Sequence, residues 1–168
     1  MPSLPREAYV RNGVWLTVPP LAISFGLWGA LPEAYGSEQF DAGMPAWWRL
    51  TENVLRLVVF GLPAALVVGS RAELSRMAWP CYGLGLLAYL ASYLMLVLWP
   101  EGAWSTSAVG FTAPAWTPAF WLVGLAMLCR ASWLWARWRW WMYLVPVAAF
   151  LAVHVGHAGA VWSRADFG

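Results

Sequence analysis

The chain has 168 residues, of which 61% are hydrophobic and 11% are charged, and its formal net charge is +2. A soluble domain carries roughly 25% charged residues, so this composition excludes a water-soluble globule. All ten basic residues are arginines and they form no basic stripe, which excludes a nucleic-acid partner. The sequence therefore predicts an all-α, polytopic integral membrane protein embedded in a lipid bilayer.

Five apolar stretches are long enough to cross a bilayer, which takes roughly 20 mostly apolar residues. In chain order the predicted spans cover about 13–31, 53–70, 77–99, 114–133 and 140–162. The first is interpreted as a retained span, because no small-residue cleavage site of a signal peptide follows it. Pro19, Pro20 and Pro63 stand inside the first two spans, where proline is expected to bend a helix. The chain is thus predicted to form a single transmembrane domain, a bundle of five helices.

The arginines set the predicted orientation, because basic residues favour the cytoplasmic side of a membrane. With the N-terminus inside, seven arginines fall in inner segments and three in outer segments or at a span edge. Most of the acidic residues then fall outside. We expect a multi-pass protein of the cell's inner (plasma) membrane, with its N-terminus cytoplasmic and its C-terminus outside.

Polar residues on three of these helices are predicted to meet in one layer near the outer surface. Glu52, Asn53 and Arg56 fall in the outermost turns of the second helix. At 1.5 Å per residue, His154 and His157 lie roughly 21–26 Å along the fifth helix, in its outer third. The third helix brings further polar side chains to a similar depth: Tyr89, Ser92 and Tyr93.

One interpretation of this layer is a binding or accessory protein with an outward-facing pocket. The pocket would take an apolar or amphipathic small ligand, or a partner subunit. Arg56 would hold the anionic end of a ligand, with Tyr89 and Tyr93 as walls and Trp104 or Trp47 as a lid. The predicted ligand-binding residues are Glu52, Asn53, Arg56, Tyr89, Ser92, Tyr93 and Trp104. The odd number of spans leaves open a homo-oligomer or one subunit of a larger membrane complex.

A second interpretation assigns chemistry to the same layer and makes the protein a membrane-embedded enzyme. His154 and His157 can ligate one metal if Glu52 supplies a third ligand, and such a metal can activate water. One histidine could instead be an axial haem ligand or carry a proton. A third reading is structural: Glu52 and Arg56 form an i,i+4 ion pair at a helix start, and the histidines hydrogen-bond across helices. The sequence alone leaves these readings open.

The first outer loop ends in Pro45-Ala46-Trp47-Trp48, and Val145-Pro146 stands near the start of the fifth span. With five spans, about 160 residues and fifteen tryptophans, the chain resembles the tryptophan-rich sensory protein, or translocator, family. It departs from that family after Trp48, where Arg49-Leu50-Thr51-Glu52 replaces a W-x-P-P element. The resemblance implies a five-helix bundle that binds porphyrins or sterol-like ligands.

Overall fold

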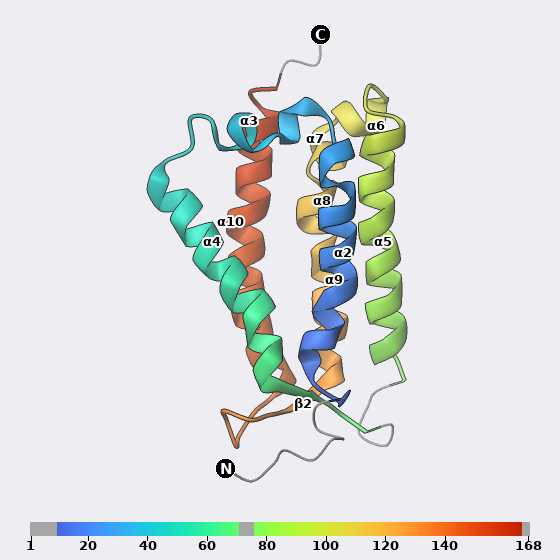
Figure 1. The fold of residues 1–168 in the computed structure, drawn as a ribbon, viewed down its shortest axis with the longest axis vertical. Coiled ribbons are helices and arrows are strands. Elements are labelled where there is room, and N and C mark those ends of the chain that lie inside the picture. The colour runs from blue at the N-terminus through green and yellow to red at the C-terminus, as the bar shows by residue number, and fades with distance from the viewer. Residues whose placement is uncertain (1–9, 71–75, 166–168) are drawn as a thin grey trace.

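The computed structural model describes residues 10–70 and 76–165 of the chain. In those residues the fold is helical, apart from a short sheet of two antiparallel strands. Figure 1 shows the long helices side by side in a bundle, with short helices closing one end and the sheet at the other. We refer to these as the α3 end and the sheet end.

Three helices among the described residues are long and apolar enough to cross a membrane. They are Gly13–Ala30, Ala78–Leu98 (α5) and Trp140–Trp162, which joins η5 (Trp140–Tyr143) to α10 (Leu144–Trp162). They cover the first, third and fifth predicted spans. The prediction of an all-helical chain with apolar, membrane-length helices is confirmed to this extent.

The first of these helices changes type along its length. It runs as η1 (Gly13–Thr17), α2 (Val18–Leu27) and η2 (Trp28–Ala30). Pro19 and Pro20 stand in the first turn of α2, where a missing backbone N–H costs no helical hydrogen bond. A bend was predicted at these prolines. The structure has a change from 3₁₀ to α geometry at Val18, just before them.

The helix in the second predicted span differs from the prediction at both ends. α4 runs from Ala46 to Gly61, directly after Pro45, and continues as η4 (Leu62–Ala65). The α geometry stops just before Pro63, which cannot donate a helical hydrogen bond. Glu52 consequently lies in the second turn of α4, and its prediction as a residue of the helix start is wrong.

The C-terminal ends of the second and fourth predicted spans are strands and not helix. β1 (Leu66–Val68) pairs antiparallel with β2 (Cys129–Ser132), with Leu66 opposite Ser132 and Val68 opposite Cys129. The fourth span is helical only over α8 (Ala113–Trp116) and α9 (Pro118–Leu128). The predicted boundaries 53–70 and 114–133 are thus wrong at these ends, because the strands satisfy their backbone groups by pairing with each other.

The two connections at the α3 end contain short helices and contact each other. One holds η3 (Glu33–Tyr35) and α3 (Ser37–Asp41), and the other holds α6 (Ala103–Thr106) and α7 (Ala108–Phe111). The Tyr35 hydroxyl donates to the carbonyl of Phe111, and the two rings stack with centroids 4.6 Å apart. These aromatic contacts close the α3 end of the bundle.

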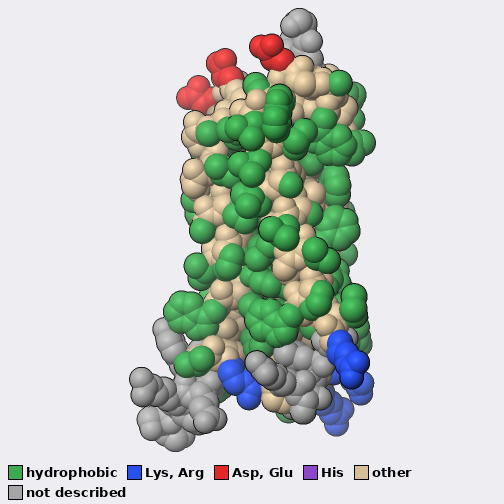
Figure 2. Space-filling view, turned by 90° about the vertical axis from the view of Figure 1, so that its right-hand side faces the viewer, with side chains coloured by type: hydrophobic (Ala, Val, Ile, Leu, Met, Phe, Trp, Pro, Cys, Tyr) green, Lys and Arg blue, Asp and Glu red, His purple; other side chains and the backbone are tan. Residues whose placement is uncertain are grey.

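The two ends of the molecule differ in charge, although Arg49, Arg56 and Arg164 lie toward the α3 end with the acidic residues. On the face shown in Figure 2, acidic side chains gather at the α3 end, arginines at the sheet end, and hydrophobic side chains cover the length between them. All acidic residues in the described part of the chain belong to elements at or near the α3 end: Glu33, Glu38, Asp41, Glu52 and Glu101.

Candidate functional site

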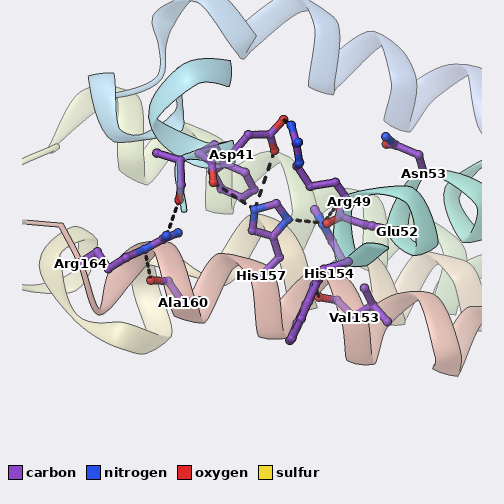
Figure 3. A network of polar contacts seen from close by, with 12 residues as sticks. Asp41, Arg49, Glu52, Asn53, Val153, His154, His157, Ala160 and Arg164 are labelled. Atoms are coloured by element: carbon purple, nitrogen blue, oxygen red, sulfur yellow. Dashed lines mark hydrogen bonds and ion pairs between the residues drawn. The ribbon is translucent and has the colours of Figure 1, made fainter. Parts of the chain in front are cut away.

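A buried carboxylate joins α4 to α10 near the α3 end of the bundle (Figure 3). Glu52 is only 3% exposed, and its two carboxylate oxygens are divided between two histidines of α10. The His154 Nδ1 atom lies 2.9 Å from Oε1, and the His157 Nδ1 atom lies 2.5 Å from Oε2. Arg56, one turn along α4, donates to Oε1 through Nη2. We call these four residues the Glu52 cluster.

His157 connects the Glu52 cluster to α3. The Nε2 atom of His157 lies 3.0 Å from the carbonyl oxygen of Phe40 in α3. A carbonyl oxygen can only accept, so Nε2 is the donor in this contact. The ring of His157 therefore bonds to α3 on one side and to Glu52 of α4 on the other.

A second ion pair lies beside the Glu52 cluster. The Arg49 Nη1 atom is 3.6 Å from Asp41 Oδ2, and both side chains are about half exposed. Asp41 Oδ1 also lies 3.9 Å from the Nε2 atom of His157. Asp41 and Arg49 thus extend the polar contacts from the cluster toward the surface.

Trp48 fixes the distance between α4 and α10 next to the cluster. Its Nε1 atom donates to the carbonyl of Val153 at 3.3 Å. Its ring lies against Gly156, where a Cβ atom would stand 3.2 Å from Cζ2 of the indole. The small residue at 156 therefore lets the tryptophan pack directly on the backbone of α10.

The Glu52 cluster lies at one end of a cavity of about 670 Å³ between α2, α4, α5, α9 and α10. Small-molecule sites commonly have volumes of about 300–1,000 Å³, with apolar walls and a few polar groups. Its polar lining comprises Ser24, Tyr35, Asp41, Arg49, Glu52, Asn53, Arg56, Tyr89, Tyr93, His154 and His157. The rest of the wall is Leu21, Phe25, Trp28, Leu31, Phe40, Leu57, Phe60, Gly61, Phe111, Pro114, Ala115, Pro118, Trp121, Phe150 and Ala158.

The cavity is closed at the back and open between α2 and α4. The lining residues Phe25 of α2 and Leu57 of α4 are 77% and 75% exposed. Lining residues of α5, α9 and α10, such as Tyr89, Trp121 and Phe150, are buried. Figure 1 shows α2 and α4 diverging toward the α3 end. The opening therefore faces sideways from the bundle.

Two tyrosines form part of the closed wall. The hydroxyl of Tyr89 lies 2.6 Å from Ser24 Oγ and 3.2 Å from the hydroxyl of Tyr93. This chain of hydroxyls ties α2 to α5 behind the cavity. Ser24 is one of two hydroxyl residues, with Thr17, inside the first apolar span, and it was not among the predicted site residues.

Most of the predicted ligand-binding residues line the cavity, but two do not. Glu52, Asn53, Arg56, Tyr89 and Tyr93 are all in its wall. The hydroxyl of Ser92 instead donates to the Tyr89 carbonyl at 2.7 Å and lies 3.3 Å from Thr117 Oγ1. Trp104 is 43% exposed outside the cavity. Both were therefore wrongly placed in the pocket, and so was Trp47 as a lid, since it is also exposed and outside the cavity wall.

The predicted metal ligands Glu52, His154 and His157 do come together. They bond one another directly through both carboxylate oxygens and both Nδ1 atoms. Within the described residues, no group of three or more His, Cys, Asp or Glu side chains is arranged to hold a metal ion. A metal or a haem at His154 or His157 remains a prediction.

Phe40 and Trp121 are site residues that the sequence analysis did not identify. Phe40 contributes both its carbonyl and its ring, whose centroid lies 4.6 Å from that of His157. Trp121 lines the cavity, and its buried Nε1 atom has no hydrogen-bond partner among the described residues. Neither residue stands out from its neighbours by type or spacing, so no sequence signal marks them.

Comparison of the chain with protein-family models, with curated proteins and with solved structures finds no match.

Proposed function

We propose that this chain is a five-span integral membrane protein that binds an apolar or amphipathic small molecule in an outward-facing pocket. The observation that carries the proposal is the apolar cavity of about 670 Å³ with the Glu52 cluster at one end. Charged groups inside a membrane protein cost several kcal/mol and usually face a cavity or a functional partner. The mixed wall of this cavity suits a ligand that has both an apolar body and a polar end.

The lengths of the two remaining helical segments are compatible with five spans. At rises of 1.5 Å for α and 2.0 Å for 3₁₀ residues, α4 with η4 extends about 32 Å. The segment Ala113–Leu128 extends about 24 Å. A hydrocarbon core is about 30 Å thick, and local thinning accommodates a somewhat shorter helix.

The separation of charges favours an inner-membrane protein with the sheet end in the cytoplasm. The arginines near that end of the described chain are Arg11, Arg76, Arg130, Arg137 and Arg139. Basic residues concentrate on the cytoplasmic side of membrane proteins. In this orientation the N-terminus is cytoplasmic, the C-terminus is outside, and the Glu52 cluster lies toward the outer surface.

The test is photolabelling of the full chain in phosphatidylcholine nanodiscs. Two probes carry the same long alkyl chain with a diazirine, one ending in glycerol and the other in phosphate. We expect at least one probe to label the chain saturably, with adducts at Phe25 and Leu57 beside the cavity opening. Labelling that does not saturate, or that spreads evenly to exposed α5 residues such as Leu84 and Leu87, would contradict the proposal.

A pair of glycine variants provides the matched control. A Cβ atom at Gly61, in the cavity wall, or at Gly83, on α5 outside it, meets nothing within 4 Å. Gly61→Phe should weaken labelling about tenfold, because displacing two methylene groups from the cavity costs roughly 1.6 kcal/mol. Gly83→Phe should leave labelling unchanged. Equal labelling of the two variants would place the bound probe outside the cavity.

A further inference from the structure

The geometry of the Glu52 cluster selects the kind of ligand head that suits the cavity. Both carboxylate oxygens of Glu52 are already bonded by His154, His157 and Arg56, so the carboxylate has little left to offer a ligand. Arg56 places a guanidinium in the cavity wall, and a guanidinium binds anionic phosphate or carboxylate groups through charge-assisted hydrogen bonds.

Hydrogen-bond donors for such an anion stand at the cavity wall. Arg56 is about half exposed and uses Nη1 for Asn53 and Nη2 for Glu52. A guanidinium has five N–H donors, so donors remain for a ligand. The ring of His154 is in the cavity wall beside Arg56, with its Nδ1 atom directed to Glu52.

The cavity extends away from these donors along apolar side chains. From Glu52 to Gly61 the helix α4 advances about 14 Å, toward the sheet end. The wall along this path includes Leu57, Phe60 and Trp121. With roughly 30 Å³ for each non-hydrogen atom, the share of one water in the liquid, the volume holds about twenty such atoms. That is enough for one alkyl chain with a compact head, and a second chain would have to stay outside the cavity.

The opening gives the direction of entry. It lies between α2 and α4, where Phe25 and Leu57 are exposed on the side of the bundle. A lipid in the leaflet at the α3 end has its head near that end and its chain toward the bilayer centre. The polar and apolar ends of the cavity have the same order.

We infer that the cavity takes a single-chain amphiphile with a compact anionic head, phosphate or carboxylate, from the lipid leaflet at the α3 end. The head lies against Arg56, and the chain runs toward Gly61. The inference rests on the proposed binding function, and it adds the charge of the ligand, its number of chains and its route of entry.

The two photoreactive probes test this inference separately from the binding proposal. In competition, the alkyl phosphate should bind at least about tenfold more tightly than the glycerol ether, a difference of about 1.4 kcal/mol. Equal saturable binding of both probes would overturn the inference and leave the binding proposal standing. Saturable binding of neither probe would overturn both.

Variants at arginine positions identify the source of the preference. Arg56→Gln should reduce the preference for the phosphate probe to near one, and Arg56→Lys should keep most of it. Arg137→Gln, an exposed arginine near the sheet end, should leave it unchanged. An unchanged preference for the phosphate probe in Arg56→Gln would overturn the assignment of the head to Arg56. If that variant does not fold, the preference of the unmodified chain still decides whether the ligand head is anionic. If inorganic phosphate competes as strongly as the alkyl phosphate, the site binds a free anion, and the proposal of an amphiphilic ligand is overturned.

Discussion

α5 and α9 meet backbone to backbone, whereas α2 and α4 diverge and leave a cavity between them. A Cβ atom at Gly85 would lie 2.3 Å from the Trp121 backbone nitrogen, and one at Gly124 would lie 2.4 Å from Tyr82. α4 is held instead by α10, through the Glu52 cluster, and by η5, through the hydroxyl of Tyr143, which donates to the Val59 carbonyl at 2.7 Å. Small residues thus close one side of the bundle, while polar contacts hold the other side open.

Removal of the shared carboxylate should have the largest effect on this arrangement. Glu52→Ala leaves His154, His157 and Arg56 without their common acceptor. Breaking a buried charge pair from one side costs about 3–5 kcal/mol. We expect a correspondingly lower midpoint in thermal unfolding followed by circular dichroism in detergent. A midpoint equal to that of the unmodified chain would mean that the cluster does not hold α4 in place.

A methyl group at the tight contact should have the next largest effect. Gly124→Ala places a Cβ atom against the backbone of Tyr82, which must shift. Overpacking of this kind costs about 1–3 kcal/mol. The same unfolding assay should show no comparable loss for Gly83→Ala, since a Cβ there meets nothing within 4 Å. Equal midpoints for the two variants would refute the close approach of α5 and α9.

The hydroxyl contact behind the cavity should contribute least. Ser24→Ala removes the partner that lies 2.6 Å from the hydroxyl of Tyr89. The net contribution of such a hydrogen bond is about 1 kcal/mol. Because Tyr89 keeps its contact with Tyr93, we expect a small decrease of the unfolding midpoint and unchanged saturation of photolabelling. Loss of labelling in this variant would show that α2 needs this contact to keep the opening in shape.

Part of the candidate site was predictable because it depends on spacing along one helix. Glu52 and Arg56 are four residues apart, so a helix brings them to one face whatever surrounds it. The depth of His154 and His157 follows from a constant rise per residue. Spacing along one helix could not predict how α4 is rotated relative to α10. This rotation places the rings of His154 and His157 on the carboxylate of Glu52.

Other errors of the sequence analysis have a physical reason of the same kind. The apolar residues of β1 and β2 read as continuations of helices, because hydropathy does not distinguish a strand from a helix end. Their pairing joins Leu66 to Ser132 across the chain, so no local pattern announces it. Ser92 was assigned to the cavity from its depth, but its direction depends on the packing of α5 against α9.

By itself the sequence determined the helical class, the long apolar helices, the separation of charge and the approximate depth of the polar residues. These properties follow from composition and from the regular geometry of a helix, which each segment carries alone. The tertiary structure decided the two-stranded sheet, the contact between Glu52 and His157, and the cavity beside α4. Each of these depends on contacts between segments far apart in the chain, such as the 105 residues between Glu52 and His157. Helix packing, and not local sequence, sets which side chains face each other there.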